Sequence, residues 1–138
     1  MTSYLLDTSF LSAFCNKDDA NHKRAQEISK EIKDGYFIIP SVVVAELSSF
    51  YKNLDFRNLV VETSLDIASE IASVTSENIL IYVSFVQEFF CNLKAVDSMI
   101  LFPSIENDAK LLTFDKRLEK EFTEVSKKIW QLHKLGIK

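Results

Sequence analysis

Four acidic residues of this sequence lie directly beside apolar runs. They are Asp7, Glu46, Asp97 and Asp115. A carboxylate so close to core-forming side chains costs desolvation energy unless a positive charge compensates it. Four converging carboxylates would also repel one another, and a hard divalent cation is the simplest group that offsets both costs. The residue types therefore predict a metal site made of carboxylates.

The positions of these acids along the chain favour their convergence on one site. Asp7 follows the apolar run Tyr4-Leu5-Leu6, and Asp115 closely follows Leu111-Leu112. If both runs are parallel strands, both acids lie at the carboxyl edge of the sheet, where such sheets bind their ligands. Asp97 lies at a predicted helix start, where the helix dipole tolerates negative charge. Glu46 lies about one and a half turns into a predicted helix, within reach of the same edge.

The elements that would position the acids alternate along the chain. Strands are predicted at 3–7, 36–39, 79–83 and 110–114, with a weak fifth at 128–132. Helices are predicted at about 8–14, 19–33, 41–50, 63–75 and 84–93, then a short one from 97 and one or two turns at 116–122; Thr8 or Ser9 and Ser41 are the predicted N-caps. Short apolar strands alternating with helices indicate a parallel sheet covered on both faces. We predict an α/β/α sandwich of three layers, with four to five parallel strands in the centre.

Length and composition are typical of one soluble domain. The chain has 138 residues, 47% of them hydrophobic and 26% charged, so we expect a single domain over residues 1–138. The net charge of −4 argues against a large basic surface for nucleic acid, although a local basic rim with a bound metal stays possible. Cys15 and Cys91 are expected to be free thiols. With no signal peptide or membrane span in the sequence, we expect a cytoplasmic protein with no membrane partner.

Four segments, in this order, resemble the motif blocks of PIN-domain ribonucleases. They are Leu-Leu-Asp-Thr-Ser at 5–9, Val-Ala-Glu-Leu at 44–47, Val-Asp-Ser-Met-Ile at 96–100 and Leu-Leu-Thr-Phe-Asp at 111–115. The segment 16–25, with Asp18, Asp19 and His22, also resembles the segment after the first helix in VapC-type toxins. The resemblance covers essentially the whole chain and implies a PIN-like fold.

The resemblance also implies roles for individual residues. Asp7, Glu46, Asp97 and Asp115 would be the acidic quartet that carries catalysis and holds Mg²⁺ or Mn²⁺, with Glu46 either binding metal or acting as a base. Thr8 or Ser9 and Thr113 would be supporting hydroxyls that orient the carboxylates. The implied reaction is metal-dependent hydrolysis of RNA phosphodiester bonds.

The resemblance further implies partners. The protein would be an endoribonuclease acting on RNA, and the toxin of a toxin–antitoxin pair that a small antitoxin protein holds in check. Related proteins commonly form homodimers, and the helical hairpin after the second strand is the expected interface. Lys94, Lys116 and Arg117 flank the predicted pocket in sequence, where each could contact phosphate or belong to a solvated face.

The same residues argue against two other α/β functions. A receiver domain needs paired acids after the first strand and an Asp after the third, but Asp7 stands alone and the predicted strand at 79–83 is followed by Ser84. A haloacid-dehalogenase phosphatase needs a second Asp where Ser9 stands. Two alternatives stay open: a catalytically inactive PIN-like scaffold that binds RNA or protein, and an RNA-processing nuclease that is not a toxin.

Overall fold

The computed structural model describes residues 1–89 and 93–134, and within them four strands form one parallel sheet. The strands are β1 (Ser3–Leu6), β2 (Tyr36–Pro40), β3 (Glu70–Ala72) and β4 (Lys110–Leu112). Their order across the sheet is β3-β2-β1-β4, and each neighbouring pair is parallel. Leu5 of β1 pairs with Ile38 on one side and Leu111 on the other, so β1 is an interior strand.

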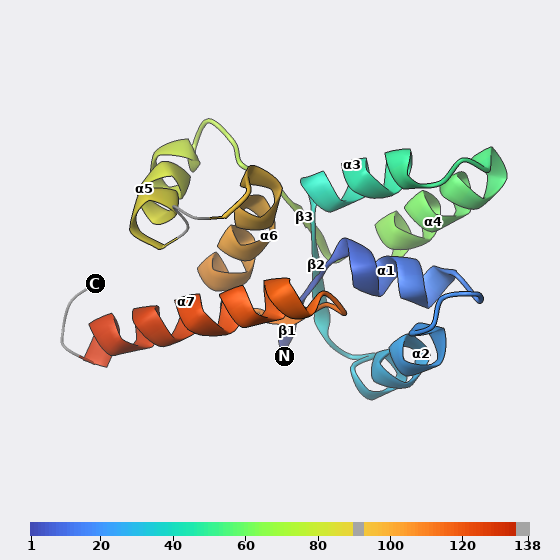
Figure 1. Cartoon of the computed structure of the whole chain (residues 1–138), viewed down its shortest axis with the longest axis horizontal. Coiled ribbons are helices and arrows are strands. Elements are labelled where there is room, and N and C mark those ends of the chain that lie inside the picture. Colours follow the sequence, from blue (N-terminus) through green and yellow to red (C-terminus); the bar gives the residue numbers. More distant parts are fainter. Residues whose placement is uncertain (90–92, 135–138) are drawn as a thin grey trace.

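Helices cover both faces of this sheet. They are α1 (Thr8–Cys15), α2 (His22–Glu31), α3 (Ser41–Phe50), α4 (Leu54–Ile67), α5 (Ile79–Phe89), α6 (Ala95–Glu106) and α7 (Lys116–Lys134). In Figure 1, α1 to α4 lie on one side of the sheet and α5 to α7 on the other. The cause is the strand order: the chain moves one way from β1 to β3 and returns past β1 to β4, and right-handed crossovers then fall on opposite faces. The predicted α/β/α sandwich is confirmed.

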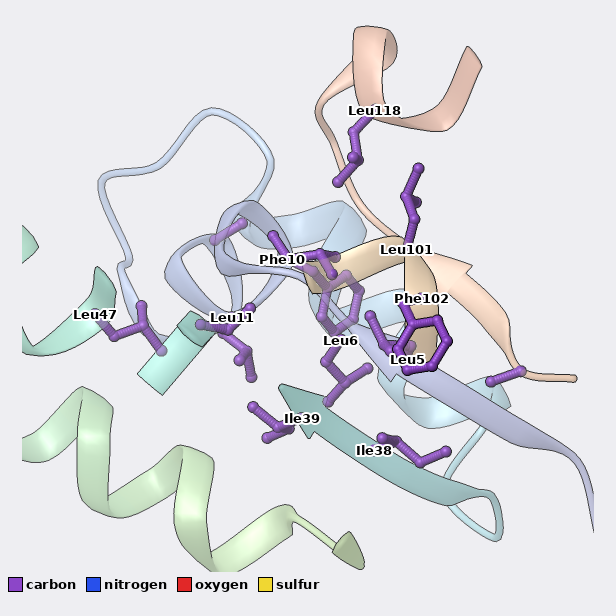
Figure 2. Close-up of a cluster of buried hydrophobic side chains, with 14 of the residues drawn as sticks. Leu5, Leu6, Phe10, Leu11, Ile38, Ile39, Leu47, Leu101, Phe102 and Leu118 are labelled. Carbon is purple, nitrogen blue, oxygen red and sulfur yellow. The ribbon is translucent and has the colours of Figure 1, made fainter. Parts of the chain in front are cut away.

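The core lies between the sheet and these two helix layers. Leu5 and Leu6 of β1 and Ile38 and Ile39 of β2 are buried consecutively, as strands covered on both faces require. Figure 2 shows the side chains that meet them from the helices: Phe10, Leu11, Leu47, Leu101, Phe102 and Leu118. Because both layers bury β1, the residue that follows it is held on a rigid support.

The strand predicted at 79–83 is wrong, since these residues begin α5. The Tyr82 amide donates to the Asn78 carbonyl (2.9 Å), so the helical turn is set as the segment begins. Tyr82, Phe85 and Phe89 pack half-buried against the core, at the spacing of one helix face. A run of five apolar residues is compatible with a strand or a buried helix, and the helical period is visible only when the window extends to residue 89.

The helix predicted at 63–75 is wrong in its second half. Helix α4 ends at Ile67, and the residues from Glu70 form β3. Ser69 favours this change from helix to strand, because its amide donates to the Phe37 carbonyl (2.8 Å) and its hydroxyl accepts the Phe37 amide (3.0 Å). These two bonds start the pairing of β3 with β2, a tertiary contact that overrides local helical spacing.

The third strand lies at Glu70–Ala72 rather than at 79–83, and a receiver domain is still excluded. Strand β3 is followed by Ser73, Val74 and Thr75, none of which is acidic. The phospho-accepting Asp of a receiver is therefore missing after the observed strand as well.

The weak strand predicted at 128–132 is also wrong, because these residues lie inside α7. Leu118 and Val125 are buried, and Phe122 and Ile129 pack half-buried beside them. Their spacing of four and three residues is that of one helix face. The helix predicted at 116–122 is thus the first part of a much longer one, and the described sheet keeps four strands.

Two further observations concern the helices and the cysteines. None of the helices in the described residues combines the length and apolar character needed to span a bilayer. Cys15 is a free thiol whose pKa is raised by burial, as expected for a packing residue. Cys91 and the end of the helix predicted at 84–93 fall on residues 90–92, outside the described residues.

Candidate functional site

A cleft of about 410 Å³ at the carboxyl edge of the sheet is lined by all four predicted acids, Asp7, Glu46, Asp97 and Asp115. Asp7 follows β1, and Asp115 lies just beyond the neighbouring strand β4. The connections adjoining these two strands cover opposite faces of the sheet, which makes the gap between them a topological switch point. The cleft therefore lies where an open parallel sheet is expected to bind its ligand.

Asp7 is held by two hydroxyls. Asp7 is only 5% exposed, and its Oδ2 accepts hydrogen bonds from Thr113 Oγ1 (2.7 Å) and Ser9 Oγ (2.9 Å). Asp7 stands at the N-cap position of α1, yet its carboxylate makes no capping bond. Since both hydroxyls bind the same oxygen, neither uses the lone pairs of Oδ1, which can serve a ligand.

The predicted N-caps are wrong, and the hydroxyls serve the cleft instead. Helix α1 begins at Thr8, whose Oγ1 donates to Glu46 Oε1 (2.7 Å), while Ser9 Oγ accepts the Phe114 amide (2.9 Å). Helix α3 begins at Ser41, with Pro40 at its N-cap position and no side-chain cap bond. Thr8 and Ser9 thus tie the start of α1 to α3 and to the segment after β4.

Asp115 caps α7. Its Oδ1 accepts the backbone amides of Arg117 (3.0 Å) and Leu118 (3.2 Å), which are otherwise unpaired donors of the first helical turn. The amide of Asp115 in turn donates to Thr113 Oγ1 (3.0 Å). Thr113 therefore contacts both Asp7 and Asp115, and it couples the positions of two acids that follow neighbouring strands.

Asp97 is paired with Arg117. The guanidinium Nη2 lies 2.8 Å from Asp97 Oδ2 and 4.0 Å from Asp115 Oδ2. The Asp97 side chain is 13% exposed and the Arg117 side chain 54%. The hydrogen bond and the charge of Asp97 raise the pKa of Arg117, so the guanidinium stays charged.

The sequence marked Arg117 only as a possible phosphate contact, and its ion pair was missed. One signal could have revealed it. Arg117 lies in the first turn of α7, where the helix dipole disfavours a cation. A basic residue in that position is stabilised when a carboxylate faces it, as Asp97 does.

The donor set of the cleft fits a hard divalent ion in chemical type. Asp7, Glu46, Asp97 and Asp115 offer only oxygen atoms, which Mg²⁺ and Mn²⁺ prefer. Their spacing is a separate matter: within residues 1–89 and 93–134, no three His, Cys, Asp or Glu side chains come close enough together to hold a metal. The positive charge between Asp97 and Asp115 is that of Arg117.

The cleft continues away from the acids along α1 and α3. This end is lined by Ser12, Asn16, Asp19, Asn21, Phe50 and Tyr51. Tyr51 donates to Ser12 Oγ (2.8 Å), which joins the end of α3 to α1, and Phe50 is largely exposed. Lys94 and Lys116 are exposed and do not line the described cleft. Two amides, the Asp19 carboxylate, the Ser12 hydroxyl and two aromatic side chains, rather than lysines, therefore border this part of the cleft.

Comparisons with known proteins agree with the fold. The family model for the PIN domain matches residues 4–124. A chain in the crystal structure of VapBC2 from Rickettsia felis, bound to a DNA fragment from their promoter, superposes with a TM-score of 0.65 at 21% identity, over 86% of this chain and 92% of that one. No curated protein matches the sequence. The family match extends from β1 into α7 and includes all four cleft acids, and the chain belongs to the PIN-domain family.

Proposed function

We propose that this protein is a metal-dependent endoribonuclease that hydrolyses RNA phosphodiester bonds. PIN domains are nucleases that generally use divalent metal ions, which supports the reaction class. The observation that carries the proposal is the shared cleft of Asp7, Glu46, Asp97 and Asp115, which come from four separate parts of the chain. Such an accumulation of carboxylates has a cost in repulsion and desolvation that a metal-dependent reaction explains.

In this proposal Asp7, Asp97 and Asp115 hold Mg²⁺ or Mn²⁺, with Glu46 beside them. The chemistry that the ion supplies when bound is activation of water and neutralisation of negative charge on the phosphate. Ser9 and Thr113 fix the orientation of Asp7 through Oδ2 and leave Oδ1 available to a ligand. The side chain therefore loses little rotamer freedom when the ligand binds. These residues act before any RNA binds, as preorganisation requires.

Glu46 has a different role in this proposal. Its Oε1 is occupied by the Thr8 hydroxyl, which leaves Oε2 to accept the proton of the attacking water. Water then adds to phosphorus as the bond from phosphorus to the leaving oxygen breaks, and the leaving oxygen takes up a proton from solvent. The half-buried position of Glu46 on α3 keeps it at the edge of the cleft, where a water molecule can reach it.

We further propose that the protein is the toxin of a toxin–antitoxin pair. The support is the likeness in fold to a chain of the VapBC2 structure, together with the VapC-like segment 16–25. The partners would then be a small antitoxin, the RNA substrate and a second copy of this chain, in the cytoplasm. Co-purification with the product of an adjacent small gene, followed by size-exclusion chromatography, tests the antitoxin; a solitary gene would favour RNA processing instead.

One observation favours a second candidate, a PIN-like scaffold that binds RNA or protein without cutting. The described residues hold no group of three potential ligands at metal-binding distance, and Arg117 already neutralises Asp97. A scaffold that only binds RNA or protein needs no metal, and so it needs no closer arrangement of these acids. A nuclease must rearrange these side chains when the metal binds.

Cleavage of a mixed pool of single-stranded and structured RNA distinguishes the two. Wild type with Mn²⁺ or Mg²⁺, wild type with chelator, and Asp97→Asn with metal are compared, with Asp34→Asn as the matched control. Asp34 is an exposed acid that precedes β2 and so lies at the opposite edge of the sheet from the cleft. We expect cutting only by metal-loaded wild type and Asp34→Asn. RNA binding with no cutting by any protein, across the whole pool, would instead support the scaffold.

A further inference from the structure

Arg117 carries an inference that rests on the proposed metal site. We propose that Arg117 is the resident counter-cation of the acidic cleft, and that a divalent ion binds Asp97 only by displacing this guanidinium. Metal affinity would then be set by a competition within the chain, and the ion pair would hold the acids in place while no metal is bound.

The geometry of the pair points to direct competition. Arg117 Nη2 occupies Asp97 Oδ2 at hydrogen-bonding distance (2.8 Å) and also lies within 4.0 Å of Asp115 Oδ2. One positive group therefore lies between two of the proposed metal ligands. Among the ion pairs of the described residues, those that involve the four cleft acids are both made by Arg117.

The environments of the two partners show why the pair forms and how it can open. The Asp97 carboxylate is nearly buried, so it needs a counter-charge at all times. Arg117 is about half exposed, so its long side chain can swing into water with little desolvation change. Its backbone need not move, since the first turn of α7 stays capped by Asp115. The guanidinium is thus a movable group on a fixed support.

The same pair accounts for the spacing of the acids. With Arg117 between them, Asp97 and Asp115 face a guanidinium rather than a shared ion, and no three acids lie at metal-binding distance in the described residues. Release of Arg117 would free Asp97 Oδ2 and let the carboxylates approach one ion. The metal-free and metal-bound arrangements then differ in the placement of Arg117 and of the carboxylates that approach the ion.

Metal titration tests the inference without any reference to cleavage. Mn²⁺ is titrated calorimetrically into wild type, Arg117→Gln, Arg117→Lys and Lys120→Gln. Lys120 is an exposed residue one turn further along α7, so its change removes the same charge without touching Asp97. Because an ion pair of this exposure contributes up to about 1 kcal/mol, Arg117→Gln should bind Mn²⁺ about fivefold more tightly than wild type. Lys120→Gln should stay within about twofold, and Arg117→Lys should lie between wild type and Arg117→Gln.

Thermal unfolding supplies an independent readout. Without metal, Arg117→Gln should have a lower Tm than Lys120→Gln, because the cleft carboxylates lose their counter-charge. With saturating Mn²⁺ this difference should shrink, since the ion has taken the place of the guanidinium. A purely structural role for Arg117 predicts the same loss of Tm with and without Mn²⁺, which would overturn the inference.

The titration separates failure of the inference from failure of the proposed function. Equal or weaker Mn²⁺ binding by Arg117→Gln, with wild type binding normally, rejects the counter-cation while leaving the metal site intact. Absence of binding by wild type and all three variants rejects the metal site and the inference together. If Arg117→Gln does not fold, Arg117→Lys decides alone, and affinity equal to or weaker than that of wild type rejects the inference.

Discussion

Thr113 ties two of the cleft acids together, although it carries no charge. Its hydroxyl donates to Asp7 Oδ2 and accepts the Asp115 amide, so one oxygen atom links the ends of β1 and β4. Ser9 adds a second hydroxyl on Asp7 and also accepts the Phe114 amide. At the residue scale the cleft therefore consists of acids and of neutral hydroxyls that orient them. The role of the hydroxyls can be tested separately from that of the acids.

Thr113→Val removes this hydroxyl and keeps the shape of the side chain. We expect the free energy of unfolding to fall by about 1–2 kcal/mol, because a partly buried carboxylate and an amide each lose a partner. We also expect metal-dependent RNA cleavage to fall about 10- to 100-fold, because Asp7 is no longer oriented. Denaturant unfolding and initial cleavage rates measure the two effects.

Thr113→Ser is the matched control for that variant. It keeps the hydroxyl and loses only a methyl group, so cleavage should stay close to that of wild type. Equal cleavage by Thr113→Val and wild type would show that the hydroxyl has no part in the reaction.

At the scale of single elements, the segment from β4 into α7 combines support with chemistry. The strand ends at Leu112, Asp115 caps the helix through its Oδ1, and Arg117 in the first turn reaches back to Asp97. A change at Asp115 therefore affects both the helix and the cleft. Alanine at this position cannot distinguish these two roles.

Asp115→Asn and Asp115→Ala together separate the cap from the charge. Asn caps helices as well as Asp does, so Asp115→Asn should keep wild-type stability within about 0.5 kcal/mol, whereas Asp115→Ala should lose about 1 kcal/mol. Both should lose Mn²⁺ binding and cleavage if the carboxylate is a ligand. Thermal unfolding and Mn²⁺ titration of the pair check this, and normal Mn²⁺ affinity in Asp115→Asn would remove Asp115 from the proposed ligand set.

The elements also differed in how well the sequence predicted them. β1, β2 and β4 were placed correctly because each is a short apolar run bounded by a polar residue, Gly35 or a charge. Residues 79–83 were misassigned because a short apolar run suits a strand and a helix alike. β3 was missed because three residues with a half-exposed Ile71 carry little pattern, and pairing with β2 makes them a strand.

At the scale of the whole molecule, exposed apolar side chains occur on the hairpin of α3 and α4, and also on α5 at Ile79, Leu80, Ile81 and Val83. Phe50, Leu54, Leu59 and Leu65 are each about half exposed or more. Solvated apolar groups of this number on one hairpin are typical of an interaction surface. This is the hairpin after the second strand, where the sequence predicted a homodimer interface.

Leu59→Glu tests that interface, because a charge in an apolar contact is costly to desolvate. We expect wild type to elute as a dimer and Leu59→Glu as a monomer in size-exclusion chromatography with light scattering. Leu80→Glu is the matched control, since Leu80 is 78% exposed on α5 in the other helix layer. Dissociation by Leu80→Glu alone would place the interface on α5, and a monomeric wild type would refute the dimer.

The sequence by itself determined the α/β class, three of the four strands and the positions of four acids beside apolar runs, because these depend on local runs of apolar and charged residues. Only the tertiary structure decided which groups meet: Thr8 with Glu46 across 38 positions, Thr113 with Asp7 across 106, and Arg117 with Asp97 across 20. Periodicity reports which face of an element is buried, while such pairs depend on strand order and helix packing. For that physical reason the acids could be predicted from the sequence, whereas the guanidinium between two of them could not.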